Sequence, residues 1–209
     1  MVHYAGIGSK FKKFMSSRPS SIRTWENWYN LADLMATAIK FYRTADIYGF
    51  LSNFKQSPFV DDYGRSWRTV EHYFQGAKFF KTDPVHAEAI RARPSPMIVK
   101  NMGNSRKHPI DPEWETIKDT VMLTALRWKF NTVDMAKLLL NTDSAILIED
   151  SPTDYYWGCG KDGSGQNKLG QLLMKVRDEL KFDLLWMAFK GYGEVDGKIG
   201  WKIDLILHI

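Results

Sequence analysis

Three capping residues that each stand directly before a proline constrain this chain more than any other feature. The pairs are Asp83-Pro84, Ser95-Pro96 and Asp111-Pro112. Aspartate and serine accept hydrogen bonds from the free N–H groups of a first helical turn, and proline tolerates the first helical position because an N–H there has no partner. Each pair therefore predicts a helix start, and together they predict a centre built from short helices.

Apolar residues spaced three or four positions apart predict further helices on both sides of this region. Thr69 can cap a helix that runs to about Phe80, because an apolar stripe begins directly after it. The same spacing predicts helices over residues 25–40, 114–128, 135–140 and 169–180.

The extended segments are short. Residues 59–60 and 66–67 flank a turn and predict a hairpin, and residues 145–148 are typical of a buried strand. Residues 48–54 look irregular and strand-like, and the alternation around residues 195–198 predicts a C-terminal hairpin. We therefore expect a mainly α fold with a few short β-strands.

The composition fits one globular domain. Of the 209 residues, 44% are hydrophobic, which is enough for one well-buried core. The chain has no run of about 18 apolar residues and no leader-like N-terminus, so we expect a cytoplasmic protein without a membrane partner. Cys159 is the only cysteine, which excludes an intrachain disulfide and fits a reducing compartment.

Neither a metal nor a cofactor is expected. The five histidines are scattered, and none stands at ligand spacing from Cys159 or from another histidine. The stretch at residues 4–9 lacks a complete G-x-G-x-x-G pattern, and no G-x-S-x-G nucleophile elbow occurs.

Charge and aromatic content allow a nucleotide-like ligand without identifying one. The formal net charge of +5 permits contact with phosphates, although a solvated basic surface explains it more simply. The chain has eight Trp, nine Tyr and twelve Phe, whose rings can stack on bases, while most of them must belong to the core.

Glu71 and Lys78 stand seven positions apart on one predicted helix, so their side chains project from nearly the same side. A carboxylate and an amine in one aromatic pocket perturb each other's protonation, as proton transfer or a nucleophilic lysine requires. The alternative is that both are exposed. A pair of sugar-cleaving carboxyl groups, Glu71 with Asp154 or Asp162, is a further alternative.

Glycines from Gly158 to Gly165 precede the last predicted helix. Backbone N–H groups approach oxygens closely where no Cβ intervenes, and the helix N-terminus near Asn167 adds a favourable potential, so the loop can hold a phosphate. A plain turn is the alternative, because no G-K-[ST] follows the glycines. Trp157 can stack on a base or ribose, or it can seal the loop as a core residue.

Two stretches of the chain resemble signatures of the NADAR superfamily, whose name refers to NAD and ADP-ribose. One is residues 67–75 (WRTVEHYFQ) with residues 48–54 (YGFLSNF) before it, and the other is W-G-x-G-x-D-G-x-G-x-N-x-L-G over residues 157–170. The resemblance covers residues 41–181 and implies a compact helical catalytic domain there. Residues 1–40 would then be an N-terminal extension with one helix, and residues 182–209 a C-terminal extension packed on the same domain.

The resemblance also implies a site. Its catalytic residues would be Glu71, Lys78 and Asp154, and its substrate-binding residues would be Tyr48, Phe50, Asn53, Trp157, Gly158, Asp162 and Asn167. The chain departs from the family pattern at Cys159, where many relatives carry an acidic residue, at Gly76, where alanine is commoner, and at residues 104–106, which are less charged.

Members of this superfamily cleave N-glycosidic bonds, so the resemblance implies an N-glycosidase that works without a metal. The partner that it implies first is DNA carrying ADP-ribose on the amino group of guanine, a modification made by toxin ADP-ribosyltransferases. The alternatives are a nucleotide-like small molecule, such as a phosphorylated riboflavin intermediate, and a non-catalytic sensor of NAD or ADP-ribose. The sequence predicts no oligomeric state.

Overall fold

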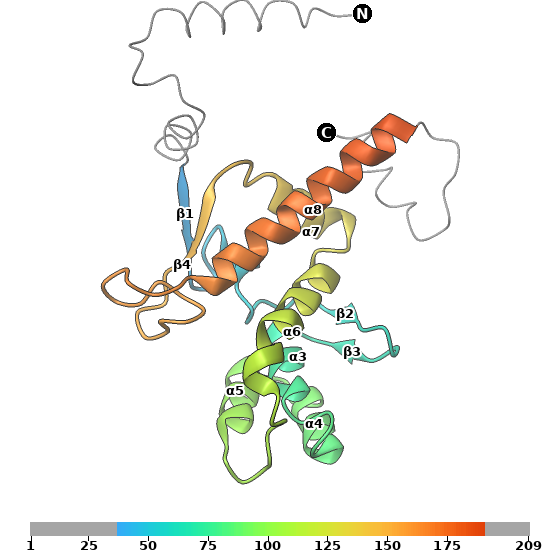
Figure 1. Cartoon of the computed structure of the whole chain (residues 1–209), viewed down its shortest axis with the longest axis vertical. Helices are drawn as coiled ribbons and strands as arrows, with labels where there is room; N and C mark the ends of the chain where they lie inside the picture. The colour runs from blue at the N-terminus through green and yellow to red at the C-terminus, as the bar shows by residue number, and fades with distance from the viewer. Residues whose placement is uncertain (1–36, 191–209) are drawn as a thin grey trace, which may run out of the picture. The chain divides into compact units, whose positions relative to one another are not determined.

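The computed structural model describes residues 37–190 of the chain. This part is mainly α-helical, as the sequence predicts, with six α-helices and two two-stranded sheets (Figure 1). The helices are α3 (Val70–Ala77), α4 (Pro84–Arg91), α5 (Pro96–Asn104), α6 (Trp114–Lys129), α7 (Val133–Leu140) and α8 (Lys168–Lys190).

Two distant segments form a parallel pair, β1 (Ala38–Phe41) and β4 (Ile146–Glu149), in which Phe41 lies opposite Glu149. Figure 1 shows them side by side, although most of the described chain separates them in sequence. The predicted helix over residues 25–40 is therefore wrong at residues 38–40, where pairing with a distant strand outweighs the local helical spacing. The rest of that predicted helix lies outside the described residues.

The hairpin predicted around residues 61–64 is confirmed, with strands β2 (Phe59–Val60) and β3 (Ser66–Trp67). The strand-like prediction for residues 48–54 is wrong. A short 3-10 helix, η2 (Gly49–Leu51), forms there instead. Gly49 is needed in this turn, because a Cβ at that position would meet the backbone of Thr44.

Capping residues start the first helices as predicted. The Oγ1 atom of Thr69 accepts a hydrogen bond from the N–H of His72 at the start of α3, and Asp83 accepts one from the N–H of His86 at the start of α4. α5 begins at Pro96, also as predicted.

The third pair behaves differently. α6 begins at Trp114 rather than at Pro112. The Asp111 carboxylate accepts from the N–H of Glu113 and its carbonyl from the N–H of Trp114, so this pair forms a turn before the helix.

The last helix is longer than predicted. α8 continues to Lys190. The alternation of apolar and polar residues in the sequence after residue 181 therefore does not form a strand over residues 182–190. The predicted hairpin around residues 195–198 lies outside the described part of the chain. None of the helices described has the combination of length and apolar character needed to cross a bilayer.

α3 lies at the centre of the helices. α3 packs against α4, α5 and α6, while α8 packs against α6, α7 and β4. At the crossing of α3 with β3, a Cβ on Gly76 would lie 3.1 Å from ring atoms of Trp67, which explains a glycine where alanine is commoner. This arrangement brings one face of α3 close to the end of β4.

Candidate active site

One pocket of about 350 Å³ is formed between α3, α5, α6, the end of β4 and the loop that follows β4. Residues from both signature stretches line it, although these stretches lie far apart in sequence. Of the residues predicted for the site, the structure brings together Asn53, Glu71, Lys78, Asp154 and Trp157.

Glu71 is buried in the first turn of α3, with 6% of its surface exposed. Its Oε1 atom accepts a hydrogen bond of 2.8 Å from Nε2 of Gln75, and its backbone N–H donates to the carbonyl of Asn53. Burial raises the pKa of Glu71, while the Gln75 hydrogen bond and the charges of Lys100 and Lys78 oppose that shift. The exposed alternative for this carboxylate is excluded.

Lys78 ends α3 and is also buried, with 7% of its surface exposed. Its Nζ atom donates to the carbonyl of Gly103 at 3.1 Å and to Oδ1 of Asn104 at 3.4 Å. It lies 5.8 Å from the ring centre of Trp114. Burial lowers the pKa of Lys78 to about 8, against the opposing charge of Glu71. A neutral, nucleophilic amine is therefore accessible near neutral pH.

Asp154 shapes the loop that carries Trp157. Its Oδ1 atom accepts hydrogen bonds from the N–H groups of Tyr156 at 2.9 Å and of Trp157 at 2.7 Å. The Trp157 ring is partly buried and meets the Phe74 ring edge to face, with 5.3 Å between their centres. Trp157 thus packs on the core and also lines the pocket, where its stacking on a base or ribose stays a prediction.

Sequence patterns do not single out Glu149, the last residue of β4, which also lines the pocket. Burial and the nearby charges of Asp154 and Glu71 raise the pKa of Glu149 to about 7. A charged residue that ends the apolar run of a buried strand is a signal that could have identified it. Gln75, Lys100, Lys118 and Trp114 are further lining residues outside the predicted set.

Buried polar atoms without partners are concentrated in this pocket. Within residues 37–190, they include Oδ1 of Asn53, Oε1 of Gln75 and Oε2 of Glu149, and all three residues line the pocket. Buried polar groups nearly always have hydrogen-bond partners, so these atoms are ready to accept from a ligand that carries hydroxyl or N–H groups.

Several backbone donors of the glycine-rich loop are already occupied, so the phosphate role predicted for this loop stays a prediction. The N–H groups of Lys168 and Leu169, at the start of α8, donate to the carbonyls of Tyr156 and Trp157, and the N–H of Gly165 donates to the carbonyl of Cys159. These donors satisfy carbonyl groups of the loop itself, which leaves them occupied where a phosphate would need them.

Asn167 has a structural position. Its Oδ1 atom accepts from the N–H of Glu149 at 2.9 Å, and its Nδ2 atom donates to the carbonyl of Leu147 at 2.8 Å. The side chain therefore fastens the loop to β4 and does not line the pocket.

The other predicted binding residues also lie outside the pocket lining. Asp162 is exposed and bonds to Ser164, and Gly158 packs so closely that a Cβ would lie 3.0 Å from the carbonyl oxygen of Asp154. Tyr48 is partly exposed, while Phe50 packs against the core. The alternative carboxyl pair of Glu71 and Asp162 is thereby excluded, whereas Glu71 and Asp154 share the pocket.

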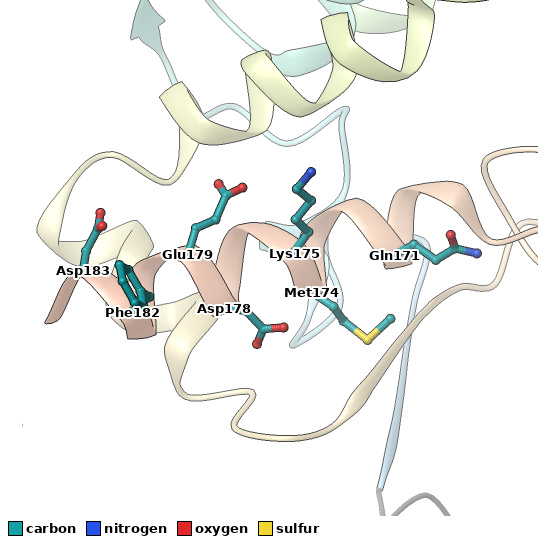
Figure 2. A pocket seen from close by; sticks show the side chains of 7 residues that line it. All are labelled: Gln171, Met174, Lys175, Asp178, Glu179, Phe182 and Asp183. Atoms are coloured by element: carbon teal, nitrogen blue, oxygen red, sulfur yellow. The ribbon is translucent and has the colours of Figure 1, made fainter. Parts of the chain in front are cut away.

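A larger hollow of about 550 Å³ lies along α8. Figure 2 shows that all seven of its labelled side chains, from Gln171 to Asp183, come from this one helix. Glu179 is already paired with Arg127, and the hollow has no buried carboxyl or amine. It lacks the chemistry of the first pocket. No group of three or more acidic, histidine or cysteine side chains between residues 37 and 190 is arranged to hold a metal ion.

Comparisons with known proteins agree with the resemblance seen in the sequence. The protein-family model of the NADAR domain matches residues 40–181. N-glycosidase YbiA of Escherichia coli (strain K12) is 45% identical over 148 residues, which are 70% of this chain and 91% of YbiA. An N-glycosidase of Nostoc punctiforme is 37% identical over 147 residues, 68% of this chain and 92% of the relative.

A larger plant protein and a solved structure complete the comparison. The chloroplastic riboflavin biosynthesis protein PYRR of Zea mays is 37% identical over 155 residues, which cover 68% of this chain and 25% of the plant protein. The NMR structure of E. coli YbiA superimposes with a TM-score of 0.66 and covers 71% of this chain and 88% of YbiA.

Proposed function

The chain belongs to the NADAR family, and from this membership and the contents of its pocket we propose that it is an N-glycosidase that hydrolyses the bond between a ribose carbon and a base nitrogen. Relatives that are named N-glycosidases, at 45% and 37% identity, support glycosidase activity. The finer assignment of substrate and residue roles is argued below from the pocket.

The observation that carries the proposal is the meeting of buried carboxyl groups with a buried amine in one aromatic pocket. Glu71 and Lys78 are both less than a tenth exposed, and Asp154 and Glu149 line the same space. Cleavage of a glycosidic bond gives C1 of the ribose the character of an oxocarbenium ion. Nearby carboxylates stabilise that positive charge, most effectively where water is excluded.

Two roles follow for the residues of α3. Glu71 orients or deprotonates the attacking group, because its buried carboxyl lies at the pocket wall and is held by Gln75. Lys78 acts as a nucleophile that forms a transient Schiff base with the opened ribose, or as an electrostatic partner of the carboxylates. The unpartnered amide oxygens of Asn53 and Gln75 accept from ribose hydroxyls.

The base and the phosphate are assigned to different residues of the lining. Trp157 stacks on the base or caps the ribose, as its position in the lining allows. Lys100 and Lys118 supply the positive charge for phosphate, since the donors of the glycine-rich loop are occupied. Lys100 and Asn104 are exposed at the rim, so the pocket is open to a substrate larger than itself.

The finer proposal is that this substrate is ADP-ribose attached to guanine bases in DNA. The open rim with Lys100 and the net charge of +5 support a phosphate-rich substrate that extends out of the pocket. The alternative is a phosphorylated intermediate of riboflavin synthesis, which is favoured by the name of the Zea mays relative.

A side-by-side assay tests both substrates. Wild-type protein is incubated with an oligonucleotide carrying ADP-ribosylated guanine and, separately, with ribosylaminopyrimidine phosphates, and the released base and sugar are quantified. Release from the oligonucleotide supports the finer proposal, and release only from the pyrimidine supports the alternative. Tight binding of either substrate without release of base or sugar would overturn the enzyme proposal in favour of a sensor.

A further inference from the structure

Four carboxyl groups line the pocket. Glu115 is exposed and pairs with Lys118, and the other three differ in the hydrogen bonds that they accept. Asp154 accepts from two backbone N–H groups, and Glu71 accepts from the amide of Gln75. The Gln75 amide opposes the rise that burial causes in the pKa of Glu71. For Glu149 no side-chain hydrogen bond occurs within the described residues, and its Oε2 atom is buried. Of the three, only Glu149 has a buried carboxyl oxygen without a hydrogen-bond partner within the described residues.

The charges around the pocket also affect Glu149. Glu149 shares the pocket lining with Glu71 and Lys78 of α3, Lys100 of α5, Glu115 and Lys118 of α6, and Asp154 of the loop after β4. Like charges that share a site with little water do not all ionise. Burial and the nearby charges of Asp154 and Glu71 raise the pKa of Glu149 to about 7, so its carboxyl can carry a proton near neutral pH.

The backbone of Glu149 is fixed on every side. Its N–H donates to Oδ1 of Asn167 and its carbonyl accepts from the N–H of Cys159 at 2.9 Å, while Phe41 is its partner in β1. A Cβ on Gly158 would lie 3.0 Å from this carbonyl oxygen, so the close packing at this position favours glycine. A side chain on so rigid a support is held in place before the substrate arrives.

We propose that Glu149 is the general acid of the site and delivers the proton to the leaving base. The assignment rests on the proposed glycosidase function and adds a catalytic residue that neither signature stretch contains. The evidence is the position of Glu149 in the pocket lining, the buried oxygen without a partner, and the backbone held by β1, Cys159 and Asn167.

The proton balance of the step is complete. As the C–N bond breaks, its electron pair stays on the base nitrogen, which takes the proton from the Glu149 carboxyl. The ribosyl C1 bonds to a water oxygen, directly or after transient bonding to Lys78, and the water proton passes to the Glu71 carboxylate. Transfer of that proton to Glu149, directly or through solvent, restores both groups. The net reaction is addition of water across the C–N bond.

The first test measures turnover on whichever substrate the wild type hydrolyses. Glu149→Gln keeps the size of the side chain but has no acidic proton, and we expect kcat to fall by about 10² to 10⁴-fold with little change in KM. Glu149→Asp retains an acid with a shorter reach, so its kcat should lie between those of the wild type and Glu149→Gln. Asp150→Asn is the matched control, because the adjacent Asp150 pairs with Lys40 at 3.0 Å outside the pocket lining.

The second test does not need activity or the glutamine variant. Carboxyl carbon NMR of the wild type, with the Glu149 signal assigned through Glu149→Asp, should show Glu149 titrating near neutral pH. Titration below about pH 5, near the ordinary value for glutamate, would overturn the assignment. So would a folded Glu149→Gln variant with wild-type kcat. Absence of base release by the wild type from both substrates would instead overturn the glycosidase proposal itself.

Discussion

Among single residues, burial decides which side chains of this chain can do chemistry. The helical spacing of Glu71 and Lys78 predicts that they share a side, but spacing does not distinguish a solvated helix face from a pocket. In the structure both are buried, and burial raises the pKa of Glu71 and lowers that of Lys78. Their reactivity is therefore a property of the surroundings.

Glu71→Gln should lower kcat by about 10² to 10⁴-fold, because the amide cannot accept a proton from the attacking group. The measurement is initial-rate kinetics on the substrate that the wild type hydrolyses. Glu88→Gln is a suitable control, since Glu88 is exposed and pairs with Arg91 away from the pocket. Near-normal turnover of the Glu71 variant would remove its proposed acid–base role.

Lys78 should form a covalent adduct if it attacks C1 of the ribose. Borohydride added during turnover should trap the Schiff base, detected by mass spectrometry of the intact protein. Because only the neutral amine attacks and its pKa is about 8, trapping should increase as the pH rises and level off above that value. Lys78→Arg should give no adduct, and Lys81→Arg, at an exposed position, should behave like the wild type. An active wild type that yields no adduct would leave Lys78 only the electrostatic role.

Trp157→Ala should weaken substrate binding by roughly 1–3 kcal/mol if a base stacks on the ring. Calorimetric titration of substrate into the inactive Glu71→Gln protein, with and without Trp157→Ala, measures this change in affinity without turnover. Trp128 packs against Phe59 and Tyr73 outside the pocket lining, so Trp128→Ala should lower stability and leave affinity unchanged. If Trp157→Ala shows that same pattern, Trp157 serves only the core.

Among the elements, the crossing of α3 and α5 controls the site. A Cβ at Gly103 would overlap the side chain of Gln75, the residue that bonds Glu71, and the Gly103 carbonyl accepts from Lys78. The closeness of these two helices therefore sets the positions of both proposed catalytic groups.

Gly103→Ala should destabilise the fold by about 1–3 kcal/mol through overpacking and should also lower kcat, because the two helices must move apart. Chemical denaturation and kinetics measure the two effects. Asn101→Ala, exposed on the same helix, should change stability by less than about 0.5 kcal/mol. Full activity of Gly103→Ala would show that the site tolerates a shift of α5.

Most helices could be predicted because their signals are local. The capping hydrogen bonds of Thr69 and Asp83 act within one turn, and so does Pro96, although the Ser95 side chain makes no capping hydrogen bond. α3, α4 and α5 therefore begin where the sequence indicates. β1 could not be predicted, because its helical apolar spacing is overridden by pairing with β4. The register of that pair depends on a contact between segments more than 100 residues apart in the chain.

In the whole molecule, Asn167 joins the glycine-rich loop to the strand that carries Glu149. Its two hydrogen bonds to the backbone of β4 connect the second signature stretch with the pocket. Its φ of 50° lies in the left-handed region, which asparagine adopts more readily than most residues.

Asn167→Ala should therefore destabilise the protein by about 1–3 kcal/mol for each backbone group of β4 left without a partner. Because Glu149 would lose its support, we also expect kcat to fall. Thermal unfolding and kinetics check both, with Gln166→Ala as the control at an exposed neighbouring position. Reduced activity without reduced stability would indicate contact of Asn167 with the substrate.

The sequence by itself determined the helical class, most helix starts, the family and the spacing of Glu71 and Lys78, because these depend on neighbours within one or two turns or on short signature stretches. Only the tertiary structure decided that Glu149 lines the pocket, that Asn167 supports β4 and that several loop donors are occupied. Burial, charge interactions and donor occupancy depend on distance through space, which for these groups is set by contacts between segments far apart in the chain.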